Sequence, residues 1–324
     1  MRAAQVIQPI GPDGVKVVDV PDATALPGTV LVRVHSVGLA FPDLLLSKGQ
    51  YQLRPRVPFT LGVDVAGTVE ALGEGVEGFE VGQRVAGMMP YGGAAELVAV
   101  PEDAVVPLPD SIFFDQGAAL GMNYLTAQFT LAERAQLKPG ETVLVHGASG
   151  GVGTATIQVA RGMGARPIGV VSTPEKAEVA RAAGAEEVIL ADGFLEQVQE
   201  LTSGKGVDVV VDVVGGPLFT DSLRALAPLG RLMVVGFASG EGIPQVKVNR
   251  LLLNNVDVRG VGWGAYAMVR PGYIADQWRA LLPMIEAGIV DPPIDADYVL
   301  DDVADALRVL DERRAVGKLV VRVS

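Results

Sequence analysis

Hydrophobic and polar positions alternate along the first third of the chain. In the segment TVLVRVHSVGL, Val30, Val32 and Val34 fall on one face, and polar side chains such as Arg33 fall on the other. An alternation with a period of two is typical of a strand that is buried on one side. Further short segments of this kind, including VAGTVEALG and AAELVAVP, are separated by turns that contain glycine. The pattern predicts a compact antiparallel or barrel-like β domain over residues 1–119.

The pattern changes in the middle of the chain, where the apolar segments become continuous. ETVLVHGAS, RPIGVVS, EEVIL, VDVVVDVVGG and RLMVVGF are each separated from the next by a segment of helical length. Strands made almost wholly of valine and isoleucine are typical of a parallel sheet with both faces covered. The alternation of strand and helix therefore predicts an α/β fold with a doubly wound parallel sheet over residues 120–264.

The last part of the chain contains two helical segments and then the strand KLVVRVS. A single closing strand needs a sheet with which to pair, and we expect it to return to the first domain. The predicted organisation is one domain formed by residues 1–119 and 265–324 and a second domain formed by residues 120–264.

A cluster of small residues, ASGGVG, joins the strand VLVH to a helical segment. Ala148, Gly150 and Gly153 occupy the three small positions of a dinucleotide-binding fingerprint, with alanine in the first. At the second position the backbone can approach a pyrophosphate, and at the third the helix can pack closely on the strand. The amide groups at the start of the helix then face the negative charge. We expect Gly150, Gly151 and Val152 to contact the pyrophosphate of a bound dinucleotide.

The end of the following strand indicates which dinucleotide binds. NAD sites usually place an acidic residue there to bind the ribose hydroxyls. This chain instead continues with Ser172, Thr173, Pro174, Glu175 and Lys176. Threonine suits the N-cap and proline the first helical position, which puts the lysine in the first turn, where the helix dipole disfavours a cation unless an anion is bound. A 2′-phosphate held by Ser172 and Lys176 supplies that anion, so the predicted cofactor is NADPH.

Composition and charge narrow the class of protein. Of the 324 residues, 49% are hydrophobic and 20% are charged, as in a well-packed globular protein. A net charge of −12 disfavours nucleic acid and anionic membranes as partners. The sequence shows no signal-peptide pattern and no apolar run long enough to span a bilayer, so we expect a cytoplasmic protein. With no cysteine in the chain, disulfides, thiolate nucleophiles and thiolate metal ligands are excluded.

Several longer motifs resemble one known family. The segments GLAFPDLLLSKGQY, VPFTLGVDVAGTVEALGEGVEGFEVGQRV, LKPGETVLVHGASGGVG and GFASG, and the closing GKLVV, are similar to those of the medium-chain dehydrogenase/reductase superfamily. Within it, the chain resembles the zinc-free NADPH:quinone oxidoreductase and zeta-crystallin-like branch over essentially its whole length. The resemblance implies a GroES-like, β-rich catalytic domain and a Rossmann domain that binds NADP.

The resemblance also shows which metal ligands this chain lacks. Zinc-dependent members place a cysteine in a G-x-C-x-x-D segment and a His-Glu pair in GHE, and the equivalent segments here are GLAFPD and GVD. Ala40, Val63 and Asp64 therefore stand where the thiolate, the imidazole and the glutamate would be. His35 and His146 are the only histidines in the chain, and two histidines are too few for a zinc site without thiolates. We interpret both as structural residues and expect no metal.

These features restrict the chemistry. Oxidation of an alcohol, or reduction of an isolated carbonyl, needs a group that stabilises an alkoxide, such as zinc. No tyrosine is followed by a lysine four residues later, so the Tyr-x-x-x-Lys pair of short-chain reductases is absent as well. Hydride transfer from NADPH to a quinone or an α,β-unsaturated carbonyl compound needs less assistance. Two alternatives stay open: an enoyl-thioester (enoyl-CoA or acyl) reductase and a non-catalytic nucleotide-binding scaffold.

The resemblance implies further site residues. Thr126 is expected near the nicotinamide ribose or carboxamide. The loops expected to flank the nicotinamide ring contain Val214, Phe237 and Ser239. The expected substrate pocket is lined by Ala40, Phe41, Tyr51, Tyr124 and Trp263, and Tyr51 is the candidate for a catalytic hydrogen bond to the acceptor oxygen. Related reductases usually carry asparagine in place of Ala40 and tyrosine in place of Ala191, so the pocket is expected to be more apolar and the selectivity for NADPH weaker.

The segment VDVRGVGW, residues 256–263, is expected to form the last strand of the nucleotide-binding sheet. An apolar edge strand favours pairing with a second copy of itself across a two-fold axis. We therefore expect a homodimer with a continuous sheet.

Overall fold

The computed structural model describes residues 1–323, which divide into two compact units. Unit 1 consists of Met1–Met122, Arg270–Trp278 and Ile294–Ser324, and unit 2 consists of Asn123–Val269 and Arg279–Pro293. Residues 265–269 and 279–293 thus group with the second unit, whereas the sequence pattern assigned the whole of residues 265–324 to the first domain. The last residue of that expected segment, Ser324, lies outside the described residues.

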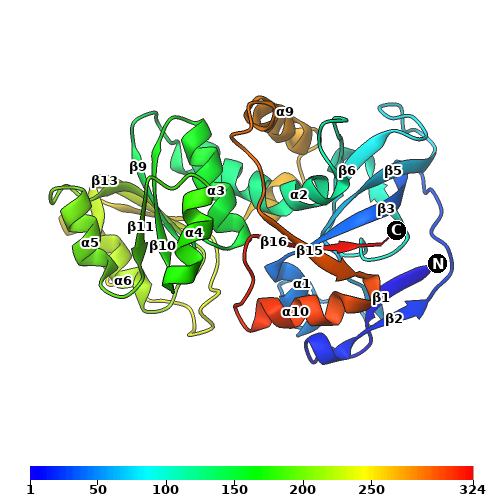
Figure 1. The fold of residues 1–324 in the computed structure, drawn as a ribbon, viewed down its shortest axis with the longest axis horizontal. Coiled ribbons are helices and arrows are strands. Elements are labelled where there is room, and N and C mark those ends of the chain that lie inside the picture. Colours follow the sequence, from blue (N-terminus) through cyan, green and yellow to red (C-terminus); the bar gives the residue numbers. More distant parts are fainter. Residues whose placement is uncertain (324) are drawn as a thin grey trace. The chain divides into compact units, whose positions relative to one another are not determined.

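Unit 1 is built mainly from strands. They are β1 (Arg2–Val6), β2 (Val15–Asp19), β3 (Thr29–Leu39), β4 (Phe59–Thr60), β5 (Asp64–Leu72), β6 (Arg84–Met88), β7 (Leu97–Pro101), β8 (Val105–Pro107), β15 (Ile294–Val299) and β16 (Lys318–Arg322). The unit also contains the helices α1 (Phe41–Ser47) and α10 (Val303–Asp311) and the first parts of α2 (Phe114–Gln128) and α9 (Tyr273–Glu286). One sheet has the order β15-β16-β3-β5-β6-β8, with β7 also paired to β3, and another has the order β2-β1-β4 (Figure 1).

The alternation seen in the sequence explains how β3 is buried. Val30, Val32 and Val34 are at most 1% exposed, whereas Arg33 points to solvent and pairs with Glu70 on β5. The closing strand β16 pairs antiparallel with β3, so the expected return of the tail to the first sheet is confirmed.

Unit 2 alternates strands and helices. Its strands are β9 (Thr142–His146), β10 (Arg166–Val171), β11 (Glu187–Leu190), β12 (Val207–Asp212), β13 (Leu226–Val234) and β14 (Asp257–Gly260). Its helices are the end of α2, the π-helical continuation Phe129–Ala135, α3 (Gly151–Gly162), α4 (Pro174–Ala182), α5 (Phe194–Leu201), α6 (Leu218–Arg224), α7 (Asn249–Asn254), α8 (Trp263–Ala267) and the second part of α9 (Tyr273–Glu286). Among the helices of the described residues, none is both long and apolar enough to cross a membrane.

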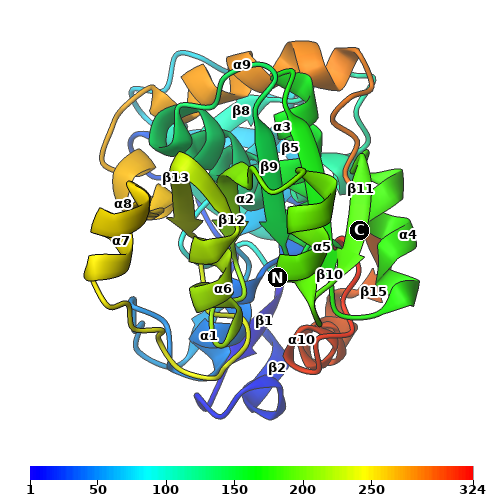
Figure 2. The same cartoon turned by 90° about the vertical axis from the view of Figure 1, so that its left-hand side faces the viewer.

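The parallel sheet of unit 2 has helices on both faces. Figure 1 shows α3 and α4 on one face and α5 and α6 on the other, and Figure 2 shows the strands between them. On the second face, Leu144 and Val210 of the sheet are fully buried with Phe194 of α5 and Leu223 of α6. The predicted doubly wound α/β fold is thus confirmed.

The order of the strands locates the edge at which a ligand can bind. The sheet has the order β11-β10-β9-β12-β13-β14, and every neighbouring pair is parallel. The chain runs from β9 outward to β11 and then returns to β12 on the other side of β9. Ligands of such sheets bind outside the carboxyl ends of the strands where the order reverses. That position lies at the ends of β9 and β12, at His146 and Asp212.

One expected strand is shorter than predicted. Residues 256–263 were expected to form the last strand, and β14 does occupy the edge of the sheet, but it ends at Gly260. Gly262 is the N-cap residue of α8, which begins at Trp263, so the tryptophan lies on a helix and not on the strand. Glycine has no side chain to pack in a sheet and weakens a strand, which explains the early end.

Candidate functional site

The loop between β9 and α3 has the geometry of a phosphate-binding turn. β9 ends at His146, Gly147 has a φ of 65°, and Gly150 is the extended N-cap residue before α3 begins at Gly151. The left-handed conformation at Gly147 favours glycine because glycine has no Cβ atom. Gly147 was not among the expected contact residues, although the spacing G-x-x-G-x-x-G over residues 147–153 carries that signal.

The glycines of this loop tolerate a side chain to different degrees. At Gly153 a Cβ atom would lie 2.1 Å from the carbonyl oxygen of Gly147, so the close packing expected at this position is present. At Gly150 the nearest atom would be that same oxygen, 3.5 Å away, so this side of the loop is open. The first amide groups of an α-helix have no acceptor inside the helix. An open glycine before the free amides of α3 fits the pyrophosphate of a dinucleotide.

Of the other expected contact residues in the loop, Ala148 is bound to a neighbouring strand, whereas Gly151 and Val152 are partly exposed. Ala148 is fully buried, and its amide donates to the carbonyl oxygen of Val170 (3.1 Å), so it anchors the loop to β10. Gly151 and Val152 are half-buried in the first turn of α3. A Cβ atom on Gly151 would lie 2.2 Å from Nδ2 of Asn123, a buried residue of α2 that the sequence interpretation did not single out.

The loops that follow β12 and β13 form one layer with the glycine turn. A Cβ atom on Gly147 would lie 2.8 Å from Cγ2 of Val213. The amides of Ala238 and Ser239 donate to the carbonyl oxygens of Val213 and Val214, at 3.0 and 2.9 Å. The structure thus brings together the loops expected to contact the pyrophosphate and the loops expected to flank the nicotinamide.

Asp212, at the end of β12, holds this layer together and was not predicted. Its Oδ1 accepts hydrogen bonds from the amides of Val214 and Gly215, both at 2.8 Å, and its carbonyl oxygen accepts one from Val235 (2.9 Å). Phe237 lies against the same loop, since a Cβ atom on Gly215 would lie 2.9 Å from its ring. An aspartate at the carboxyl end of a buried strand is the sequence signal that could have identified this position.

The segment between β10 and α4 has the expected cap with one difference. Thr173 is the N-cap residue and Pro174 follows, but the threonine hydroxyl bonds to the Glu175 carboxylate and not to the helix amides. A hydrogen bond from its own amide and the bond from Thr173 lower the pKa of Glu175. Ser172 is exposed and Lys176 is half-buried, in the first turn of α4. A lysine and a glutamate therefore both lie in the first turn of α4, at the position where an adenosine ribose would lie.

The expected site residues Tyr124, Thr126 and Trp263 are almost fully buried inside unit 2. Tyr124 is 1% exposed, and its hydroxyl donates to Oε1 of Gln158 at 2.6 Å. Burial raises the pKa of Tyr124 well above its ordinary value. Thr126 is 8% exposed, and its carbonyl oxygen accepts a hydrogen bond from Thr130 (2.6 Å). Trp263, on α8, is also buried. Tyr124 thus already has a protein partner for its hydroxyl.

The other expected pocket residues belong to unit 1. Ala40 is buried and is the N-cap residue of α1, where its amide donates to Oδ2 of Asp43 (2.9 Å). Phe41 follows as the first residue of α1 and is 37% exposed. Tyr51 is half-buried, and burial, aided by the negative charge of Asp43, raises the pKa of its hydroxyl. Two of the expected pocket residues, Ala40 and Phe41, therefore form the start of α1.

A fully buried group of charges lies next to α1 in the same unit. Asp43 also accepts a hydrogen bond from the amide of Gly62 (2.8 Å), and burial raises its pKa to about 6. Asp64 pairs with Lys318, with 2.6 Å between Oδ2 and Nζ, and its Oδ1 accepts a hydrogen bond from the amide of Met122 (2.8 Å).

These residues do not fit a catalytic zinc ion. Ala40 and Val63 carry no ligand atom, and both oxygens of Asp64 are already engaged, one of them by an ammonium group. No cluster of three or more histidine, cysteine, aspartate or glutamate side chains suited to a metal ion occurs within residues 1–323.

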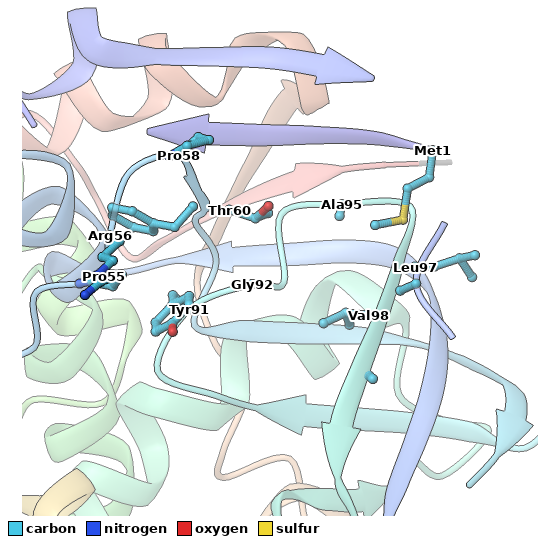
Figure 3. Close-up of a pocket in the computed structure, with 13 residues that line it drawn as sticks. Met1, Pro55, Arg56, Pro58, Thr60, Tyr91, Gly92, Ala95, Leu97 and Val98 are labelled. Atoms are coloured by element: carbon cyan, nitrogen blue, oxygen red, sulfur yellow. The ribbon is translucent and has the colours of Figure 1, made fainter. Parts of the chain in front are cut away.

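Unit 1 also has a separate hollow of about 480 Å³ that contains none of the expected site residues. Figure 3 shows Arg56, Tyr91 and Met1 around it. Phe59 and Tyr91 pack edge to face in its wall, with 5.7 Å between ring centroids. The hollow lies beside β4 and β7 and is open to solvent.

Comparisons with known proteins agree with both units. The family model for the alcohol dehydrogenase GroES-like domain matches residues 26–110, and the model for zinc-binding dehydrogenase matches residues 151–287. Quinone oxidoreductase from Pseudomonas aeruginosa is 38% identical over 96% of this chain and 96% of its own length. The crystal structure of quinone oxidoreductase from Pseudomonas syringae pv. Tomato DC3000 is 37% identical, with a TM-score of 0.91 over 99% of each chain.

A structure with bound cofactor is similar as well. Escherichia coli quinone oxidoreductase complexed with NADPH is 28% identical, with a TM-score of 0.92, and the similarity covers 99% of this chain and 100% of that chain. The similarity to quinone oxidoreductases extends over essentially the whole length of sequence and fold. The chain therefore belongs to the quinone oxidoreductase branch of the medium-chain dehydrogenase/reductase superfamily.

Proposed function

We propose that this protein transfers a hydride from NADPH to a quinone or an α,β-unsaturated carbonyl compound without the help of zinc. The observation that carries the proposal is the layer of loops at the ends of β9, β12 and β13, with its open side at Gly150. The NADPH in the similar Escherichia coli enzyme supports the choice of cofactor. The pairing of Asp64 with Lys318 supports the zinc-independent part, because this carboxylate is not available to a metal ion.

When bound, NADPH would supply the hydride from C4 of its nicotinamide. Residues of the chain bind and orient it. Gly150 and the amides of Gly151 and Val152 would hold the pyrophosphate, and Ser172 and Lys176 would hold the 2′-phosphate. Thr126, Val214, Phe237 and Ser239 would border the nicotinamide and its ribose. Holding the donor at a near-attack distance from the acceptor is the main catalytic contribution we assign to the protein.

The class of acceptor follows from the groups that the protein provides. A quinone or a conjugated enone spreads the charge of the arriving hydride over its own π system, so modest hydrogen bonds stabilise the resulting anion and a proton from solvent completes the reduction. Tyr51 would donate one of these bonds to the acceptor oxygen. The pKa of its hydroxyl is raised from an ordinary value of 10.0, so the hydroxyl is protonated at neutral pH, as a donor must be. Within unit 1, Ala40 and Phe41 would supply apolar surface for the acceptor.

The preference for NADPH over NADH is expected to be moderate. Lys176 favours a 2′-phosphate, whereas the ionised Glu175 beside it disfavours one and could accept hydrogen bonds from the ribose hydroxyls. Two opposite charges in the same turn of α4 reduce the difference in affinity between the cofactors.

A homodimer through the edge of unit 2 is part of the proposal. β14 forms the edge of the parallel sheet, and α7, which precedes it, exposes Leu252 and Leu253 by 76% and 73%. Exposed apolar side chains next to an edge strand are typical of an interface with a second copy. Sedimentation equilibrium of the wild type should give a dimer of the 33.7 kDa chain, and a Leu253→Glu variant should give the monomer. A monomeric wild type would contradict this part of the proposal.

An acceptor panel tests the proposed reaction. Purified protein treated with a chelator is given NADPH or NADH together with a para-quinone, a simple enone or an enoyl-CoA. We expect NADPH oxidation with the quinone or the enone, undiminished by the chelator. A clear preference for enoyl-CoA would favour the enoyl-thioester reductase instead, and NADPH binding without turnover on any acceptor would favour a scaffold.

A further inference from the structure

A buried polar cluster lies directly beneath the loop layer of unit 2. Its side chains, those of His146, Asp212 and Ser222, come from residues that are at most 1% exposed. Val145 of β9 pairs in register with Val211 of β12, so the next residue of each strand, His146 and Asp212, lies beside the other. Both face the side of the sheet that α5 and α6 cover, where Ser222 is located on α6.

The hydrogen bonds of Ser222 determine the tautomer of the histidine. Its Oγ donates to the carbonyl oxygen of Leu218 at 2.8 Å and lies 2.8 Å from Nε2 of His146. A hydroxyl has a single hydrogen, so Nε2 must carry a hydrogen and donate it to Oγ. The ring of Phe194 meets the imidazole edge to face, with 4.9 Å between centroids. Burial lowers the pKa of the imidazole to about 4, so at neutral pH His146 is a neutral donor fixed from two sides.

Two acceptors of the cluster have no hydrogen-bond partner among residues 1–323. They are Nδ1 of His146 and Oδ2 of Asp212. Unpaired buried polar atoms destabilise a fold, and apolar side chains of similar shape would avoid that cost. Polar clusters that weaken the core in this way are expected at functional or strained sites.

The cluster fixes both ends of the loop that follows β12, residues 213–217. At the start of the loop, Oδ1 of Asp212 accepts hydrogen bonds from the amides of Val214 and Gly215. At its end, the chain enters α6, which the bond between Ser222 and His146 ties to β9. Between these two anchors the loop lies against the glycine turn.

We propose that His146 is a positioning residue for the cofactor: it holds α6 through Ser222 and, together with Asp212, sets residues 213–217 against the glycine turn. The inference rests on the proposed function, because this loop borders the nicotinamide only if NADPH occupies the loop layer. His146 itself touches neither the cofactor nor the acceptor. It acts through the loop, so its loss should weaken cofactor binding and leave the binding of the acceptor unchanged.

Four variants test the role of this histidine. His146→Leu removes both ring nitrogens, Ser222→Ala removes the hydroxyl, and His146→Gln retains an N–H donor for Ser222. His35→Leu is the matched control, because His35 is the only other histidine and lies in unit 1, stacked on Phe114. The measurements are the dissociation constant of NADPH without acceptor, the KM and kcat for NADPH and for the quinone, and hydrogen exchange at Val214 and Gly215 in the cofactor-free protein.

We expect His146→Leu and Ser222→Ala to raise the dissociation constant of NADPH roughly tenfold. Both variants should also speed hydrogen exchange at the amides of Val214 and Gly215. The KM for the quinone should not change, and His146→Gln should restore most of the affinity. Folded variants with wild-type affinity and wild-type exchange at these amides would overturn the proposal, even if they melt at a lower temperature. If the wild type itself does not bind NADPH, the proposed function fails, and the exchange rates still decide whether His146 holds the loop.

Discussion

Lys318 and Asp64 form an ion pair that is buried inside unit 1, with side chains 2% and 1% exposed and 2.6 Å between Nζ and Oδ2. Lys318 is the first residue of the closing strand β16, and Asp64 is the first residue of β5. The second oxygen of Asp64 binds the amide of Met122 in α2. One carboxylate therefore connects the tail, the sheet and a helix, at the position where zinc-dependent relatives are expected to carry a glutamate.

Removal of one partner of this pair should be costly. A Lys318→Met variant leaves the Asp64 carboxylate buried without its cation, and we expect the free energy of unfolding to fall by about 3–5 kcal/mol. The double variant Lys318→Met/Asp64→Asn should recover part of this loss, because no buried charge is left. Denaturant unfolding measures both.

The matched control is Lys48→Met, which breaks the pair of Lys48 with Asp311. These side chains are 27% and 39% exposed, so the expected loss is at most about 1 kcal/mol. If Lys318→Met costs no more than this control, the buried pair does not stabilise unit 1 and its structural role is refuted.

The buried His146 should make stability depend on pH. Burial lowers its pKa to about 4, below its ordinary value of 6.5. The unfolded chain then binds more protons than the folded chain between these values, so stability rises with pH across this window and is lost as the pH falls. The contribution is about 3 kcal/mol at most.

Asp43 acts in the opposite direction in nearly the same window, because burial raises its pKa to about 6. Its contribution is present at low pH and lost as the pH rises. The difference between wild type and His146→Gln, measured by denaturant unfolding at pH 7 and pH 4.5, isolates the histidine. The wild type should lose more stability than the variant on acidification, and parallel losses would refute the assignment.

Gly150 and Gly153, at the start of α3, should respond differently to substitution by alanine. Gly153→Ala places a Cβ atom within 2.1 Å of a carbonyl oxygen, so we expect a loss of about 1–3 kcal/mol in stability. In Gly150→Ala the nearest atom to the new Cβ atom is the carbonyl oxygen of Gly147, 3.5 Å away, so the loss in stability should be less than about 1 kcal/mol. The new methyl group would nevertheless block the approach of the pyrophosphate. Thermal unfolding and NADPH titration separate the effects. Wild-type affinity in Gly150→Ala would show that the phosphate does not approach this glycine.

The choice between cofactors should depend on the first turn of α4. Lys176→Ala should raise the KM for NADPH roughly tenfold or more, as expected for the loss of a charged hydrogen bond, and leave the KM for NADH nearly unchanged. Glu175→Gln should change the ratio in favour of NADPH, because it removes the negative charge next to the phosphate. Steady-state kinetics with both cofactors checks each variant, and equal effects of Lys176→Ala on NADPH and NADH would contradict the assignment.

Much of the fold could be predicted because its signals are local. Continuous valine segments and the glycine spacing near Gly150 depend on neighbours in the chain, and so does the alternation around Val32. The end of β14 was predicted too late because the strand propensity of its valines hid the effect of Gly260 and Gly262.

The parts of the site that escaped prediction depend on distant residues. The aspartate at the end of β12 is a local signal, but nothing near His146 in the sequence shows that Ser222 of α6 binds its ring. The partner of Tyr124 lies 34 positions away at Gln158, and Lys318 and Asp64 are 254 positions apart, so neither pair leaves a local pattern.

The most direct measurement is anaerobic oxidation of NADPH by the chelator-treated protein with a para-quinone as acceptor. We expect catalytic turnover in which one NADPH is consumed for each quinone reduced, at the same rate before and after removal of metal ions. Activity that disappears with the chelator and returns with added zinc would contradict zinc-independent hydride transfer.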